Sequence, residues 1–155
     1  MIWTVSWTGT VIGYDTSSLL KNGTWGPQRG LAVGASITNC AFSWAPEIFW
    51  DDMQNQWMLY WSVSISGSTT RIYHSHITGS FFTNFEMPAV MYNPGFDIID
   101  ADIIRVAANN YQMFFKDERS GYKYIRRAYG ATTPSTGYTT YTNYVAAATT
   151  EGPTV

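Results

Sequence analysis

Two acidic residues of this chain occupy segments in which carboxyl groups could carry out acid catalysis. Glu151 lies in Glu-Gly-Pro-Thr-Val at 151–155, and Asp100 lies in Ile-Ile-Asp-Ala-Asp-Ile at 98–103. Carboxyl groups at strand ends are the minimum for cleaving a glycosidic bond, because one protonates the leaving oxygen while others activate water and tune that acid. The alternative is structural: a solvated glutamate beside a Gly-Pro turn, and an aspartate that caps a turn.

The composition indicates a single aromatic-rich β domain. The chain has 155 residues, of which 13% are charged and 17% are aromatic, with seven Trp and eleven Tyr. A formal charge of −2 gives no electrostatic reason to bind nucleic acid, and no stretch reaches the roughly 18 apolar residues of a membrane span. We therefore expect neither a nucleic-acid partner nor a membrane partner. The single Cys40 fits a small buried hydrophobic residue.

A pair of strand patterns recurs three times in the same order. Each copy has an aromatic or β-branched run followed by a second such run: 2–7 then 11–16, 57–62 then 71–76, and 111–116 then 123–128. The copies are spaced by roughly 50 to 60 residues, which is close to one four-stranded blade of a β-propeller. The pattern predicts an all-β propeller fragment of about three blades. A β-sandwich with similarly spaced strands is the alternative.

Further segments complete the predicted blades. Residues 47–50 and 102–106 precede the second and third pairs as first hairpin arms, and the first copy lacks this arm. Residues 17–25 and 78–85 would supply a turn and an outer strand, and 132–150 a loop with a fourth outer strand. We expect almost no helix.

Three motifs resemble glycoside hydrolase family 43. Phe-Ser-Trp-Ala-Pro-Glu-Ile-Phe-Trp-Asp at 42–51, with the strand that follows, resembles the second-blade signature; Ile-Asp-Ala-Asp-Ile at 99–103, with 111–118, resembles the third-blade segment; and Glu-Gly-Pro at 151–153 resembles the opening of the fourth blade. The motifs follow the family's order and span nearly the whole chain. The family contains five-bladed propellers that cleave arabinose- and xylose-containing polysaccharides. The resemblance therefore implies that residues 1–155 form a partial catalytic propeller domain, without the first strand of the first blade and without the last blades.

The resemblance also implies roles for the acidic residues. Family 43 enzymes are inverting hydrolases with three carboxylates, and Asp100 matches the Asp that modulates the pKa of the acid, whereas Glu151 matches the general acid. Asp102 alternates with Asp100 on one strand face, so the choice of Asp100 rests on the resemblance. The general base has no match and is expected upstream of Met1, because Asp15 follows the second strand of its hairpin. We therefore expect little or no activity from this chain alone.

Four other residues are candidates for binding substrate. Trp44 and Glu47 enter a strand near the expected pocket, where an indole can stack on a sugar and a carboxylate can accept its hydroxyl hydrogens. Lys116 and Glu118 follow an aromatic strand whose end approaches that pocket in the resemblance. The alternatives are blade packing for Trp44 and a surface ion pair for Lys116 with Glu118.

No metal and no cofactor is expected. His74 and His76 share a strand face, but two ligands without a carboxylate or cysteine at metal spacing are insufficient. The leading prediction is a fragment of an inverting hydrolase acting on plant-type polysaccharides or oligosaccharides that contain arabinose or xylose. The alternative is a non-catalytic carbohydrate-binding propeller, and an Asp at the start of the first blade would distinguish the two.

Two further expectations concern partners and location. A protein-interaction propeller of the WD or kelch kind is disfavoured, because the repeats lack Trp-Asp ends and Gly-Gly pairs. We expect a secreted or extracellular protein, although the first residues do not have the pattern of a signal peptide. The sequence leaves open arabinose against xylose specificity, exo against endo cleavage, and the oligomeric state.

Overall fold

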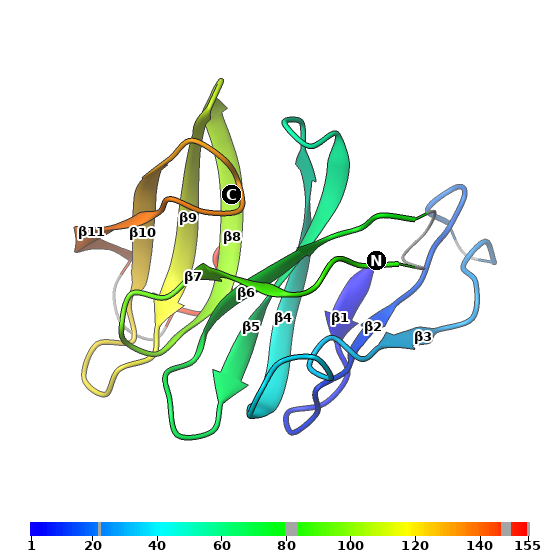
Figure 1. Cartoon of the computed structure of the whole chain (residues 1–155), viewed down its shortest axis with the longest axis horizontal. Coiled ribbons are helices and arrows are strands. Elements are labelled where there is room, and N and C mark those ends of the chain that lie inside the picture. Colours follow the sequence, from blue (N-terminus) through cyan, green and yellow to red (C-terminus); the bar gives the residue numbers. More distant parts are fainter. Residues whose placement is uncertain (22, 80–83, 147–149, 155) are drawn as a thin grey trace.

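The computed structural model describes residues 1–21, 23–79, 84–146 and 150–154. Within these ranges the chain contains strands, turns and loops and no helix, so no helix is present that could cross a membrane. The strands form three antiparallel sheets that lie side by side, with the second sheet in the middle (Figure 1). The all-β fold with about three propeller blades is therefore confirmed.

Each sheet is a blade of strands that are consecutive in the chain. The first sheet contains β1 (Ile2–Thr4), β2 (Ile12–Tyr14) and β3 (Arg29–Leu31). The second contains β4 (Cys40–Asp51), β5 (Gln56–Ile65), β6 (Arg71–His76) and β7 (Ala89–Tyr92). The third contains β8 (Ile98–Ala107), β9 (Asn110–Asp117), β10 (Ile125–Ala131) and β11 (Thr139–Ala146).

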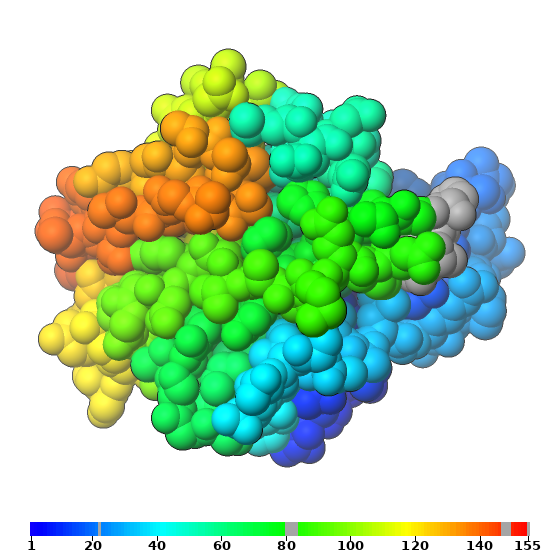
Figure 2. All heavy atoms as spheres, viewed as in Figure 1, coloured from blue at the N-terminus to red at the C-terminus, as the bar shows by residue number. Residues whose placement is uncertain are grey.

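Two apolar cores hold the blades together. The strands of the second and third sheets enclose a cluster that includes Tyr60, Ile72, Tyr111 and Phe115, all of them buried. A smaller cluster around Trp61 joins the first sheet to the second. Side chains fill the space between the ribbons, as Figure 2 shows for one face of the molecule. The aromatic-rich composition therefore serves blade packing first, because large rings bury much apolar area per residue.

In the first two blades the outer strands lie later in the chain than the sequence patterns predict, whereas β11 of the third blade lies within the predicted 132–150. Residues 17–25 and 78–85 were expected to supply the outer strands of these two blades. Among the described residues these segments contribute isolated bridges, Ser17 with Trp25 and Phe85 with Ile77, while residue 22 also lies outside the described ranges. The outer strands are β3 and β7 instead. These strands are three and four residues long, which is too short for side-chain alternation to identify them. Part of 78–85 lies outside the described residues.

Candidate active site

The candidate catalytic residues line one pocket between the blades. Its volume is about 560 Å³, and it is bounded by Trp7, Trp44, Ser64, Ser68, Thr70, Asp97, Ile99, Asp100, Glu118 and Glu151. Adjoining hollows share Trp7 and Asp100 or Glu151 with this pocket and extend it towards Glu47, Lys116 and Lys123. The structure thus brings all six sequence-predicted site residues to one region.

A bulge at the same place in two blades directs the chain into this pocket. The register of β4 on β5 shifts between Trp44 and Glu47, and the register of β8 on β9 shifts between Ile99 and Asp102. Within each bulge one residue has a left-handed backbone, Ala45 with φ 45° and Asp100 with φ 53°. The bulge re-aims its side chain away from the regular pleat, as bulges beside active sites commonly do.

Hydroxyl groups from the preceding blade fix both bulges. The N–H of Ala45 donates to Thr4 Oγ1 at 2.9 Å, and the N–H of Asp100 donates to Ser62 Oγ at 3.0 Å. A bulged residue cannot give its N–H to the sheet ladder, so a hydroxyl acceptor satisfies a donor that would otherwise be costly to bury. The backbone position of Asp100 is therefore set by the neighbouring blade.

The bulge also separates Asp100 from Asp102. Regular alternation was expected to place both on one strand face, but that expectation was wrong because Asp100 and Ala101 lie in the register shift. Asp102 instead pairs across the sheet with Phe114, and its charge acts on Glu47. Burial and then this neighbouring charge raise the pKa of Glu47. Asp100 is the member of the pair that lines the pocket with Glu151.

The Asp100 carboxyl group is held in an environment that disfavours its charge. Burial raises its pKa above the ordinary value, and the charge of Glu151 acts in the same direction. A hydrogen bond from the backbone of Gly152 and the charge of Lys116 oppose this rise without cancelling it. A carboxyl group whose charged form is disfavoured by burial and by a neighbouring negative charge, as in Asp100, keeps its proton to a higher pH than a solvated one.

Two tryptophans form the aromatic wall of the pocket. The Trp44 ring stacks on Phe42 with 5.2 Å between ring centroids, and its indole N–H donates to the carbonyl oxygen of Trp7 at 2.9 Å. The Trp7 side chain is highly exposed, with a relative exposure of 84%. The sequence analysis missed Trp7, whose only signal was an aromatic residue at the end of a strand run. Both tryptophans line the pocket.

Four charged residues alternate in sign along one side of the pocket. The Lys116 ammonium contacts Glu151 and lies 3.5 Å from Glu118 Oε1, while Glu118 also contacts Lys123. Lys116 is buried, with 3% of its side chain exposed, whereas the Glu151 side chain is 68% exposed. The ionic alternative considered for Lys116 and Glu118 is thus present, although the lysine is buried.

A protein-family model described as "Probable glycosyl hydrolase domain", related to glycoside hydrolase family 43, matches residues 16–155. The chain belongs to this family. The match includes the segments that carry Asp100 and Glu151, and it confirms the family predicted from the three motifs. Comparison with curated proteins and with solved structures gave no match.

His76 of this glycosyl hydrolase domain lies in a network of buried polar contacts. His76 Nε2 lies 2.9 Å from Asp51 Oδ2, and the other carboxylate oxygen of Asp51 accepts the N–H groups of Met53 and Gln54. Burial and then the charge of His76 lower the pKa of His74 to about 4. In the described ranges, no group of three or more His, Cys, Asp or Glu side chains could hold a metal ion.

Asp15 lies apart from the pocket of the glycosyl hydrolase domain. The residue directly follows β2, where it is buried and its Oδ1 accepts the N–H of Thr16 at 2.7 Å. A carboxylate occupied in this way is a poor candidate for activating water, as the sequence order had suggested.

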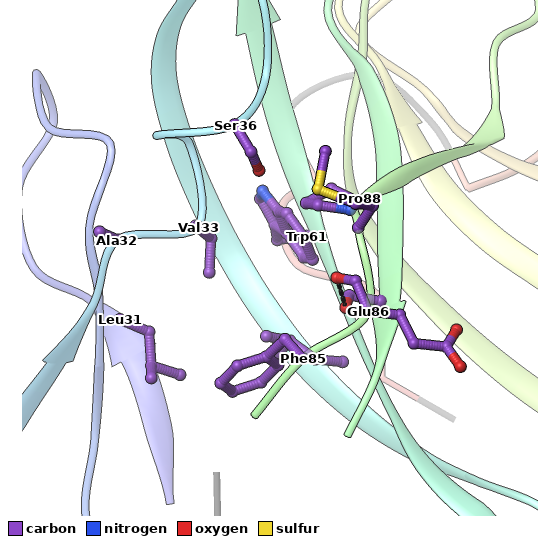
Figure 3. A pocket seen from close by; sticks show the side chains of 11 residues that line it. Leu31, Ala32, Val33, Ser36, Trp61, Phe85, Glu86 and Pro88 are labelled. Carbon is purple, nitrogen blue, oxygen red and sulfur yellow. Dashed lines mark hydrogen bonds between the residues drawn. The ribbon is translucent and has the colours of Figure 1, made fainter. Parts of the chain in front are cut away.

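A second cavity of the glycosyl hydrolase domain lies between the first two blades. Its volume is about 210 Å³, and its walls are mostly apolar, with Leu31, Val33, Trp61, Phe85 and Pro88 among them. Figure 3 shows the Glu86 carboxylate directed away from Trp61. Because Glu86 is the acidic residue in the described lining of this cavity and its carboxylate points away, the pocket with Asp100 and Glu151 is the better candidate for hydrolytic chemistry.

Replacing Asp100 with asparagine is expected to stabilise the domain at neutral pH. The folded-state pKa of Asp100 is raised, so its ionised form destabilises the fold, and stability is lost as pH rises from the unfolded value of about 4 through the folded value. Asparagine removes that charge and tolerates a left-handed backbone. Urea unfolding should show a gain at pH 7 that shrinks on acidification. A pH-independent difference, or a loss at pH 7 greater than that of the exposed control Asp52→Asn, would contradict this expectation.

Proposed function

We propose that this chain carries the proton-donating half of the active site of an inverting glycoside hydrolase. Its substrates are polysaccharides or oligosaccharides that contain arabinose or xylose. The observation that carries the proposal is the convergence of Asp100 and Glu151 in one pocket with two exposed or half-buried tryptophans. Convergent carboxyl groups beside aromatic platforms suit a substrate that is neutral, polar and ring-shaped.

Glu151 is the general acid in this proposal, and Asp100 supports it. As the bond to the anomeric carbon breaks, its electron pair goes to the leaving oxygen, which takes the proton from Glu151. Water adds from the opposite face and loses a proton to a base, which we assign to no residue of this chain. The negative charge of Asp100, when it is present, favours the protonated form of a neighbouring carboxyl group.

In this proposal the two tryptophans of the aromatic wall and Glu47 contact the substrate. Trp44 is already fixed by Phe42 and by the carbonyl of Trp7, so little ordering is needed when a sugar stacks on it. Glu47 lines a hollow with Asp100 and Glu151, where its carboxylate can accept hydrogen bonds from sugar hydroxyls. Trp7 adds a second exposed surface.

An external nucleophile tests the proposed acid directly. With phenyl arabinofuranoside or phenyl xyloside, the chain should release little phenol, and azide should increase the release because azide attacks the anomeric carbon without needing a base. Glu151→Gln should abolish that azide-dependent release, since phenol is a poor leaving group without a proton. The sugar product should be a glycosyl azide of inverted configuration, which NMR identifies.

The control for this experiment is Glu86→Gln, which removes an exposed carboxylate away from the pocket. It should leave the azide-dependent release unchanged. Release that is the same in Glu151→Gln and the unmodified chain would refute Glu151 as the acid. Hydrolysis without azide that depends on Glu151 would show instead that the chain contains its own base.

A non-catalytic carbohydrate-binding propeller is the second candidate. The exposure of Trp7 favours this candidate, because an exposed indole can bind a sugar by stacking without any catalytic step. This candidate predicts sugar binding with no azide-dependent release and no effect of Glu151→Gln on any reaction.

A further inference from the structure

Three residues occupy equivalent positions in successive blades, on β1, β5 and β9. Each pairs with an isoleucine of the following strand: Thr4 with Ile12, Ser62 with Ile72, and Lys116 with Ile125. In the first two blades the residue is a hydroxyl acceptor that fixes a left-handed residue of the next blade. Lys116 has donors only, so the same position must engage an acceptor of the next segment in another way.

The acceptor that Lys116 engages is the side chain of Glu151. Glu151 contacts Lys116 as Ala45 contacts Thr4 and as Asp100 contacts Ser62. Glu151 and Asp100 also line the same pocket. The position that holds a backbone N–H in two blades therefore holds a carboxylate in the third.

A second carboxylate keeps the Lys116 ammonium in place. Glu118 Oε1 lies 3.5 Å from Lys116 Nζ, and the other oxygen of Glu118 contacts Lys123. The Glu118 backbone is itself anchored, because its N–H donates to the carbonyl of Asp97 at 2.8 Å. Lys116 is thus shared between one fixed carboxylate and one exposed carboxylate.

The Lys116 amine remains charged in this setting. Burial alone would lower its pKa, but the hydrogen bond to Glu151 and the charges of Glu151 and Glu118 outweigh burial and raise it. An ammonium group between two carboxylates keeps its proton at neutral pH, because both negative charges stabilise the protonated form.

We propose that Lys116 is a positioning residue for Glu151, which it holds beside Asp100 and stabilises as a carboxylate once Glu151 has given its proton to the leaving oxygen. This role rests on the proposed function and replaces the direct substrate contact expected from the sequence. While Glu151 is protonated, Glu118 retains the ammonium. When the proton leaves, the full charge of Lys116 acts on the new carboxylate. An interaction that strengthens as charge develops lowers the barrier more than one that is constant.

Nitrogen-15 NMR of the lysine ammonium groups tests the shared contact without any substrate. In the unmodified chain the Lys116 signal should titrate at high pH. Glu151→Gln and Glu118→Gln should each move that titration to lower pH, because each removes one of the two charges that oppose burial. The control Glu86→Gln should leave it in place. Since the Glu151 side chain is largely exposed, Glu151→Gln does not threaten folding. A Lys116 titration that is unmoved by Glu151→Gln overturns the proposal.

Sugar affinity separates positioning from direct substrate contact. If Lys116 acts through Glu151, Lys116→Met should bind a xylo- or arabino-oligosaccharide within about twofold of the unmodified chain. A direct charged hydrogen bond to the sugar would instead cost about tenfold or more on removal, and that loss overturns the proposal. If no sugar binds at all, the proposed function fails, while the lysine titration still decides whether Lys116 is coupled to Glu151.

Discussion

Replacing Asp117 with alanine is expected to lower the free energy of unfolding by about 3–5 kcal/mol, the cost typical of breaking a buried ion pair by removing one partner. The Asp117 side chain is fully buried at the end of β9. Its carboxylate accepts a hydrogen bond from Arg126 Nε–H at 2.6 Å. It also accepts hydrogen bonds from two guanidinium N–H groups of Arg119 at 2.6 and 3.0 Å. Arg126 is itself buried and would be left with an unpaired charge. Urea unfolding at neutral pH measures the loss.

The matched control is the exposed pair of Asp52 and Arg105. Asp52→Ala should cost less than about 1 kcal/mol, because the remaining Arg105 charge stays solvated when its partner is removed. Equal losses in Asp117→Ala and Asp52→Ala would contradict the account of the buried pair. Since Asp117 lies between Lys116 and Glu118, the variant should also disturb the charged side of the pocket.

The Asp117 carboxylate also makes the free energy of unfolding depend on pH. Burial raises the pKa of Asp117, but the hydrogen bonds from Arg119 and Arg126 outweigh burial and hold the pKa below its ordinary value. The stabilisation is therefore complete above the unfolded pKa of about 4 and is lost as pH falls through the folded value. In Asp117→Asn this acid-dependent loss should be smaller than in the unmodified chain. Urea unfolding between about pH 2 and pH 6 measures both slopes.

Replacing Trp44 with alanine is expected to weaken binding of xylo- or arabino-oligosaccharides by about 2 kcal/mol, or roughly thirtyfold in affinity. The indole of Trp44 is one of the two aromatic faces in the pocket, and its orientation is fixed before a ligand arrives by Phe42 and by the Trp7 carbonyl. Alanine removes the stacking surface and leaves the β4 backbone in place. Isothermal titration calorimetry measures the change in affinity.

Trp50→Ala is the control for this prediction, because Trp50 lies on the same strand and is also partly exposed. Its ring packs at 74° against Trp57, with centroids 5.2 Å apart, near the β4–β5 turn. This variant should retain the sugar affinity of the unmodified chain. An equal loss of affinity in Trp50→Ala and Trp44→Ala would show that the effect is not local to the pocket.

The order of the blades could be predicted from sequence because the inner strands are long and strongly patterned. Runs such as 57–62 and 111–116 lie wholly within β5 and β9, where side-chain alternation extends far enough to be recognised. The outer strands β3 and β7 were not predicted, because backbone pairing with the neighbouring strand determines their position more than their own side-chain pattern does.

The sequence named candidate residues for the pocket but not their geometry. Motif resemblance singled out Asp100 and Glu151 as candidates, and both line the pocket. The bulges at Ala45 and Asp100 have no sequence signal, because glycine, the residue that usually marks a left-handed φ, stands at neither position. The coupling of Lys116 to Glu151 joins residues 35 positions apart. Such a contact depends on how the segment at 150–154 packs beside β9, which local patterns do not encode.

The central claim is that the pocket bounded by Trp7, Trp44, Asp100 and Glu151 binds a pentose-containing oligosaccharide. Proton–nitrogen NMR of the seven tryptophan indoles, during titration with xylo- and arabino-oligosaccharides up to about 10 mM, tests it most directly. The account predicts saturable shifts of the Trp7 and Trp44 indole signals, with those of Trp50 and Trp57 unchanged. Shifts confined to Trp50 and Trp57, or no shift of Trp7 and Trp44 with either sugar, would contradict it.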